Sequence, residues 1–199
     1  TGRSELIGAY ASYHGSTQGA LSLLGSEHQK KGYRPLLPNT NFIRFNDEKD
    51  LEKITTKTAA VLLETIQGGA GFILPEKEYL KKVQSQCKKV GALLILDEIQ
   101  PGFGRTGKFF GFEHFDVQPD IVVMGKGMGG GLPVGAFTAS RELMELLEDH
   151  PKLGHITTFG GNPVIAAACL ATLRELRDSK LIGEIPKKEA LFRSELKHE

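Results

Sequence analysis

Two residues of this chain are well placed to take part in a reaction. They are an acid and a lysine, each at the end of a predicted strand. Residues 92–96 and 121–124 are short, unbroken apolar runs, a pattern typical of parallel strands that are buried on both faces. Asp97 ends the first strand, and Lys126 follows the second. If the strands are parallel, both side chains project from the carboxyl edge of the sheet, where open α/β sheets bind their ligands.

A carboxylate and an amine at this edge suit a cofactor with a basic ring nitrogen at one end and an aldehyde at the other, and pyridoxal 5'-phosphate is such a cofactor. Further segments lie in the same order around the two residues: DEIQ at 97–100, GFGRTG at 102–107, PDI at 119–121 and GK at 125–126. With these segments the chain resembles the class III, fold-type-I pyridoxal-phosphate aminotransferases, which include ornithine, acetylornithine and 4-aminobutyrate aminotransferases. The resemblance covers nearly the whole chain and is specific to the family, but not to a substrate.

The resemblance implies a role for each residue of this segment. Lys126 would form the Schiff base with the cofactor aldehyde and, once released by the incoming amine, would move the proton between substrate and cofactor. Asp97 would keep the ring nitrogen protonated through a charge-assisted hydrogen bond. Ile99 would pack on the ring face, and Gln100 would bond the phenolic oxygen of the ring. Taken alone, Gln100 could equally be a turn residue.

Residues on both sides of this segment extend the predicted site. In the resembled family the positions of Tyr13 and His14 lie beside the cofactor, with the aromatic ring stacked on the pyridine, although a tyrosine at a strand end can also be a core residue. Glu64, which follows a buried run at 59–63 and precedes a glycine-rich loop, matches another site position. Thr158 matches a threonine that reaches across a dimer to the partner's cofactor phosphate. Its loop equally suits the cap of the next helix.

A nucleotide site has to be considered, because residues 125–130 (GKGMGG) match the glycine pattern of dinucleotide-binding folds. That pattern should open a helix whose N-terminus holds the pyrophosphate. Here Leu132 and Pro133 lead into another predicted strand, and the lysine between the first two glycines would crowd the backbone. Asp120 also occupies the place of the first glycine of a P-loop. A nucleotide site is therefore not expected.

Composition argues against several other classes of protein. Charge is nearly balanced, with 25 basic and 24 acidic residues, and the paired lysines at 81–82 and 88–89 fall on the polar side of a predicted helix, so no nucleic-acid face is expected. No apolar stretch approaches the roughly 20 residues that span a bilayer, and the start has no signal-peptide layout. The six histidines show no metal-ligand spacing. Cys87 and Cys169 form no CxxC pair, which favours a reduced, cytoplasmic setting.

Predicted strands and helices alternate along the chain, as in an α/β fold with a mostly parallel sheet and helices on both faces. Strands are expected at 6–11, 59–63, 92–96, 121–124 and 134–139, helices at 17–24, 47–55, 75–90, 140–147, 164–176 and 186–196, and an irregular excursion at 25–47. We expect a cofactor-binding large domain over residues 1–177 and the beginning of a C-terminal small α+β domain over 178–199.

The function implied by the resemblance is amino transfer from a small-molecule donor to a keto acid, in a cytoplasmic homodimer with shared active sites. Alternatives are an aminomutase of the glutamate-1-semialdehyde type or a decarboxylase relative and, in another class, a fragment that only binds or dimerises. The family's phosphate loop and carboxylate-binding arginine have no counterpart here, so a central fragment with poor activity by itself is expected. Gly69 stands where many ornithine-type members have a glutamate that pairs with this arginine, so an unusual donor profile is expected.

Overall fold

The computed structural model describes residues 1–149, 152 and 154–196, and the chain divides into two compact units. Unit 1 comprises Thr1–Asp97, Phe115–Val123 and Phe137–Ser140. Unit 2 comprises Glu98–His114, Met124–Ala136 and Arg141–Glu199. The expected domain boundary between residues 177 and 178 stays a prediction.

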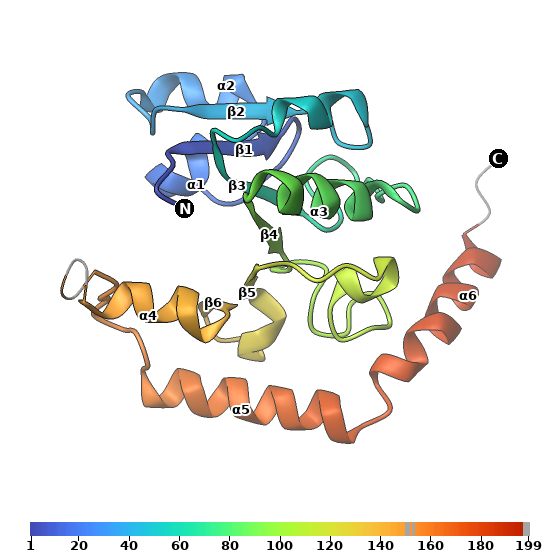
Figure 1. Cartoon of the computed structure of the whole chain (residues 1–199). Coiled ribbons are helices and arrows are strands. Elements are labelled where there is room, and N and C mark those ends of the chain that lie inside the picture. Colours follow the sequence, from blue (N-terminus) through green and yellow to red (C-terminus); the bar gives the residue numbers. More distant parts are fainter. Residues whose placement is uncertain (150–151, 153, 197–199) are drawn as a thin grey trace. The chain divides into compact units, whose positions relative to one another are not determined.

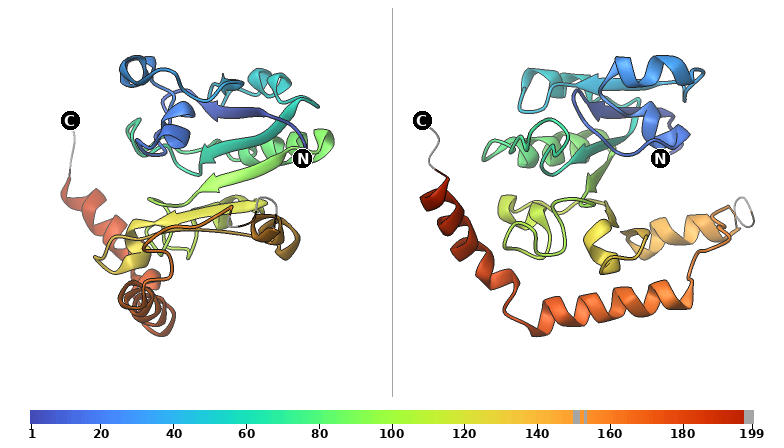
Figure 2. Two further views of the ribbon diagram at one scale, coloured as in Figure 1. Left: turned by 90° about the vertical axis from the view of Figure 1, so that its left-hand side faces the viewer. Right: turned by 180° about the vertical axis from the view of Figure 1, so that it is seen from behind.

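The strands form one sheet of six, in the order β2-β1-β3-β4-β5-β6 (Figure 1). Their bounds are Glu5–Ala9 for β1, Thr40–Ile43 for β2, Thr58–Glu64 for β3, Leu93–Asp97 for β4, Ile121–Gly125 for β5 and Gly135–Ala139 for β6. β1 pairs in parallel with β2 and β3, β3 pairs in parallel with β4, and β4 with β5. The arrows of β1, β3 and β4 accordingly point the same way in Figure 2. The predicted α/β fold with a mostly parallel sheet is confirmed.

Most of the predicted helices are present, but their first and last residues differ from the predicted ones. They are α1 (Gln18–Ser22), α2 (Glu27–Lys30), α3 (Tyr79–Val90), α4 (Arg141–Asp149), α5 (Pro163–Asp178) and α6 (Ile185–Glu195), with short 3-10 turns η1 (Lys31–Tyr33), η2 (Lys49–Lys53), η3 (Gly111–Phe115), η4 (Lys126–Gly129) and η5 (Ile182–Glu184). Among the described residues, none of these helices is long and apolar enough to cross a membrane.

Two expectations about these elements were wrong. The stretch 25–47 is not irregular throughout, because it contains α2 and the edge strand β2. β2 has four residues, of which only Ile43 is buried, so the sequence shows no periodic signal there. The predicted helix at 75–90 begins only at Tyr79, because residues 75–76 are not helical and residues 77–78 form a turn that leads into it.

The core of unit 1 lies around β3, β4 and the apolar side of α3. The side chains that are at most 1% exposed include Val61, Leu63, Leu80, Val83, Cys87, Leu94 and Leu96. This face of α3 has the three- and four-residue spacing expected of an amphipathic helix. Gly91, in the left-handed region at φ +69°, ends the helix as a C-terminal glycine does. The core thereby fixes the carboxyl ends of the two strands that carry Glu64 and Asp97.

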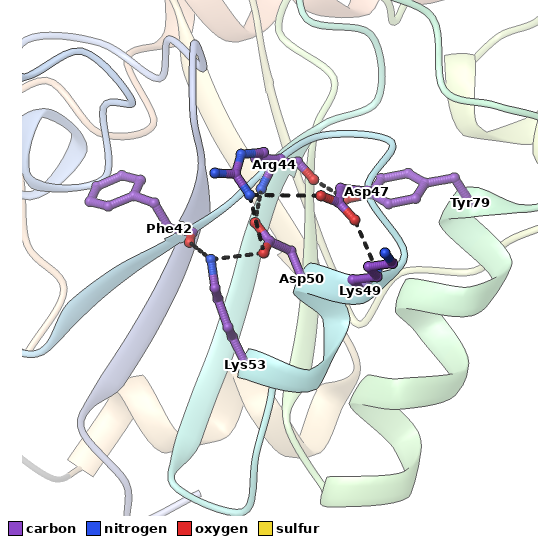
Figure 3. A network of polar contacts seen from close by, with 7 residues as sticks. All are labelled: Phe42, Arg44, Asp47, Lys49, Asp50, Lys53 and Tyr79. Carbon is purple, nitrogen blue, oxygen red and sulfur yellow. Dashed lines mark hydrogen bonds and ion pairs between the residues drawn. The ribbon is translucent and has the colours of Figure 1, made fainter.

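A network of polar contacts joins the end of β2 to η2 and α3 (Figure 3). The buried carboxylate of Asp50 accepts a hydrogen bond from Arg44 N at 2.7 Å and pairs with Lys53 Nζ at 2.9 Å. Lys53 Nζ also donates to Phe42 O at 3.2 Å, and the buried Tyr79 hydroxyl donates to Arg44 O at 3.4 Å. These contacts stabilise an edge strand that has few apolar residues of its own.

Candidate functional site

A buried acid and a histidine meet at the carboxyl edge of the sheet in unit 1. The strand register pairs Glu64 of β3 with Asp97 of β4, and Asp97 with Val123 of β5. His14 Nδ1 lies 2.9 Å from Asp97 Oδ2, and the two side chains are only 3% and 5% exposed. Three of the predicted site residues, His14, Glu64 and Asp97, are therefore gathered at one edge. The strand pattern indicated only the two strand-end acids, and His14 was predicted from the resemblance.

The other ring nitrogen of His14, Nε2, indicates that a ligand binds here. Among the described residues, His14 Nε2 is buried and has no hydrogen-bond partner. Such an atom costs free energy unless a ligand or an ordered water satisfies it. Meanwhile Nδ1 lies 2.9 Å from the carboxylate of Asp97, a contact that orients the imidazole. A buried carboxylate at the sheet edge is a suitable acceptor for a protonated ring nitrogen, so these residues fit the pyridine end of pyridoxal phosphate.

Glu64 joins the two loops at this edge. Its Oε2 accepts a hydrogen bond from Tyr13 N at 3.0 Å, and its Oε1 accepts one from Gly68 N at 3.1 Å. Burial raises the pKa of Glu64, although the two N–H groups and the nearby His14 act in the opposite direction. The structure thus uses this carboxylate to hold loop backbones, and a direct contact with the cofactor stays a prediction.

Tyr13 lies with its side chain open to solvent, half exposed at 50%. It is therefore not the core tyrosine that its position at a strand end could also have indicated. The backbone of Gly69 lies beside it, and a Cβ built on Gly69 would stand 3.4 Å from Tyr13 Cβ. Position 69 can thus take a side chain at ordinary contact distance.

Glu98 organises the loop after β4 within unit 2, a role that the sequence analysis did not assign. This residue is fully buried; its Oε2 accepts from Gly111 N at 2.7 Å and its Oε1 accepts from Phe112 N at 3.1 Å. A Cβ on Gly102 would lie 2.6 Å from Glu98 O, so this turn requires glycine. One carboxylate therefore closes the loop that carries residues 99–100. The only signal in the sequence was a second acid directly after the strand-end acid.

Replacing Glu98 by alanine should lower the free energy of unfolding of the full-length protein by about 2–6 kcal/mol. Two buried N–H groups would lose their acceptor, at about 1–3 kcal/mol each. Glu113 provides a matched control, because its carboxylate accepts from Phe110 N in the same loop but is exposed. Glu113→Ala should therefore cost about 0.5 kcal/mol or less. Urea denaturation measures both values, and equal losses for the two variants would contradict the role of Glu98.

Lys126 opens the turn η4 directly after β5, with its backbone in the left-handed region at φ +41°. A residue other than glycine is strained there, and such strain collects at functional sites. The turn is fixed from behind by α5, because a Cβ on Gly130 would lie 2.3 Å from Thr172 Oγ1. Ile99 packs beside Gly125, because a Cβ built on Gly125 would lie 3.6 Å from the Ile99 side chain. Unit 2 thus places Ile99 next to Gly125, the residue that precedes Lys126. The side chain of Lys126 is exposed.

The last two predicted site residues also belong to unit 2. Gln100 is partly buried in the turn after β4, and Thr158 is exposed in the turn before α5. Asn162 caps α5, since its Oδ1 accepts from Val164 N at 3.0 Å and from Ile165 N at 3.2 Å. The capping role considered for this loop is therefore present. After β5 the chain forms only the short turn η4, and not the long helix that a dinucleotide site needs.

Comparison with known proteins decides the family. The sequence profile described as aminotransferase class-III matches residues 1–199, which is the whole chain. This chain belongs to the class-III aminotransferases. The resemblance carried by the segments between Asp97 and Lys126 is thereby confirmed.

Individual class-III aminotransferases show what share of a relative's length this chain covers. The chain is 43% identical over 188 residues to the putrescine aminotransferase of Pectobacterium atrosepticum, covering 90% of this chain and 40% of that protein. It is 42% identical over 184 residues to the ornithine aminotransferase of Oceanobacillus iheyensis, covering 92% and 46%. The crystal structure of the Toxoplasma gondii ornithine aminotransferase matches with a TM-score of 0.90 at 32% identity, covering 98% and 46%. The chain thus spans about half the length, or less, of these relatives.

Proposed function

We propose that the full-length protein containing this chain is a pyridoxal-phosphate-dependent aminotransferase that moves an amino group from a small-molecule amine to a keto acid. When bound, the cofactor supplies an aldehyde that accepts the amine and a ring that takes up an electron pair. The observation that carries the proposal is the buried Asp97–His14 pair at the sheet edge of a class-III aminotransferase chain. Pyridoxal phosphate is also the ligand named for the Toxoplasma ornithine aminotransferase structure.

Each site residue has a task under this proposal. Asp97 holds a proton on the ring nitrogen, and His14 orients the Asp97 carboxylate through the 2.9 Å contact. The Tyr13 ring, which is open to solvent, is available to stack on the cofactor. Lys126 binds the cofactor covalently through Nζ and, when displaced by the donor, moves the proton to and from the substrate carbon.

The remaining site residues hold the cofactor in place. We propose that Ile99 packs on the ring face and that Gln100 bonds the phenolic oxygen. Ile99 is suited to this task because it already packs beside Gly125, the neighbour of Lys126. Glu64 supports the site through the backbone of Tyr13. Thr158, which is exposed, is proposed to bind the cofactor phosphate of a partner subunit.

An apolar groove in unit 2 supports the homodimer that this last role requires. The groove has a volume of about 800 Å³, and its lining includes Leu132, Phe159 and Val164. Phe159 is 81% exposed and Val164 is 67% exposed, and none of the described residues of α5 is buried. Large exposed apolar surfaces mark interaction sites. A second copy of the chain is proposed to cover the groove, and sedimentation of the full-length protein as a monomer at micromolar concentration would contradict this.

The two cysteines support the proposed cytoplasmic setting. Both are free, and Cys87 is buried in the core, where burial raises the pKa of its thiol to about 12. A thiol of this kind is inert, and neither cysteine forms a disulfide, so nothing in this chain depends on an oxidising compartment. Export of the tagged protein from its cell would contradict the setting.

The proposed reaction is tested on the full-length protein reconstituted with pyridoxal phosphate. Adding an amine donor should shift the cofactor absorbance band, and adding a keto acid should restore the band while an amino acid is released. An aminomutase would consume no keto acid, and a protein that only binds would show neither change. The relatives are named for different donors, putrescine and ornithine among them, so the assay needs a panel of amines.

A further inference from the structure

Unit 1 contains a hollow of about 340 Å³ beside Tyr13, which we call the Tyr13 hollow. Its walls come from three segments: the exit of β1, the short helix α2 with its N-cap Ser26, and the loop after β3. The lining residues are Ala11, Ser12, Tyr13, Ser26, His28, Gln29, Gly69 and Ala70. A water molecule occupies about 30 Å³ of liquid, so the hollow has room for a group of several non-hydrogen atoms.

Buried hydrogen bonds fix two of the walls relative to each other. The carboxylate of Glu64 accepts from Tyr13 N on one wall and from Gly68 N on the other, at 3.0 and 3.1 Å. Gln67, which is 1% exposed, donates from Nε2 to Tyr10 O at 2.9 Å and joins the same two segments a second time. The shape of this side of the hollow is therefore set before any ligand arrives.

The third wall is held to the first in a similar way. The buried hydroxyl of Ser12 donates to Leu23 O at 3.2 Å, and Gly25 N donates to Ser12 O at 3.3 Å. Gly25 lies so close to the exit of β1 that a Cβ would stand 2.3 Å from Ala11 N. The segment that carries Ser26, His28 and Gln29, which is α2 with its N-cap, thus follows directly on a fixed backbone position. Preformed hollows with a few placed polar groups are typical of small-molecule sites.

The polar groups of the Tyr13 hollow carry no fixed charge. Ser26 offers a hydroxyl, His28 an imidazole and Gln29 an amide, all of which can donate or accept a hydrogen bond. None of the lining residues is Asp, Glu, Lys or Arg. Glu27, the first residue of α2, is instead paired with Arg34 and Lys30. His28 and Gln29 are exposed, so a charged group that entered would keep part of its solvation but would gain no counter-charge, whereas an uncharged polar group would exchange water for protein hydrogen bonds.

We infer that the Tyr13 hollow binds the end of the amino donor remote from its reacting amine, and that it selects an uncharged hydrogen-bonding group over a second ammonium or a carboxylate. The donors would be primary amines with a distal hydroxyl or amide. This inference rests on the proposed function, because Tyr13 is the wall that the hollow shares with the proposed cofactor site. Ser26, His28 and Gln29 become the residues that determine donor specificity.

The first experiment measures kcat/KM of the full-length holoenzyme for four amines of equal length, with one saturating keto acid. The amines are 4-aminobutan-1-ol, butane-1,4-diamine, 4-aminobutanoate and butylamine, which differ only in the distal group. The amino alcohol should exceed the diamine and the amino acid by roughly three- to tenfold, the value of about one hydrogen bond against an unpaired charge. A diamine or amino acid that is used as well as the alcohol would overturn the inference.

The second experiment places a charge in the hollow. Gln29→Glu should raise kcat/KM for the diamine relative to the amino alcohol by roughly two- to fivefold, the worth of a solvent-exposed ion pair. Gln118→Glu is the matched control, since Gln118 is an exposed residue of unit 1 that does not line the hollow, and its ratio should not change. An unchanged ratio in Gln29→Glu, or an equal change in both variants, would overturn the inference.

The two experiments separate this inference from the reaction itself. Turnover of the amines without preference for the alcohol would overturn the subsite and leave amino transfer intact. Transfer from other donors, such as α-amino acids, but from none of these four amines would do the same. Only the absence of amino transfer from every donor would overturn the subsite and the proposed function together.

Discussion

Replacing Lys126 by alanine in the full-length protein is expected to abolish covalent attachment of pyridoxal phosphate and to lower kcat roughly a thousandfold or more. The variant loses both the amine that binds the cofactor and a general base, and a positioned base alone contributes about 10²–10⁴-fold. Absorbance spectroscopy after gel filtration measures the attachment, and the donor panel measures the rate.

Lys108→Ala is the control for this variant. Lys108 is exposed in the loop of unit 2 that follows β4, so its loss removes a charge without touching the turn at Lys126. The control should retain the cofactor and its rate. A Lys126→Ala protein that kept a covalently bound cofactor would show that another lysine carries it.

The second large effect is expected for Asp97→Asn, which should keep the covalent attachment but lose roughly a hundred- to a thousandfold in kcat. An amide cannot hold the ring nitrogen protonated as a carboxylate does, and removing one preorganised electrostatic contact typically has this cost. The substitution keeps the size of the side chain and an oxygen that can face His14 Nδ1. The loss should therefore appear in the rate and not in the amount of bound cofactor.

Asp120→Asn separates this effect from a general weakening of the sheet. Asp120 lies at the opposite end of the same strand pair, where its Oδ2 accepts from Leu94 N at 2.7 Å. That substitution can lower stability, but it should leave kcat within about twofold because small surface changes shift free energies by only about 0.5 kcal/mol. Normal turnover in Asp97→Asn, or equal losses in both variants, would contradict the role of Asp97.

The strands that carry the site were predictable because they consist almost entirely of apolar residues, which indicates burial. β3, β4 and β5 are short apolar runs, and the structure places each within one or two residues of its predicted bounds. Since parallel strands end at one edge, Glu64 and Asp97 could be expected together from the sequence. The contact between His14 and Asp97 joins residues far apart in the chain; the resemblance placed both residues beside the cofactor but did not predict that they touch.

Other parts of the candidate site have no signal in the sequence. β2 and α2 are four residues each and have no apolar period, so the helix that carries His28 and Gln29 was not predicted, and neither was the Tyr13 hollow. The partner of Glu98 depends on how the chain closes at Gly111 and Phe112, which is a contact between distant residues. Propensity and periodicity describe local structure, and they do not predict which loop donates hydrogen bonds to a buried carboxylate.

The most direct test of the account is to reduce the full-length holoenzyme with borohydride and to locate the modified lysine by peptide mapping. Reduction makes the bond between the lysine and the cofactor permanent, so the labelled residue is the one that binds it. We predict a single pyridoxyl-lysine at Lys126, in the left-handed position that opens η4. A label on another residue, such as the buried Lys30 or the exposed Lys108, would contradict it.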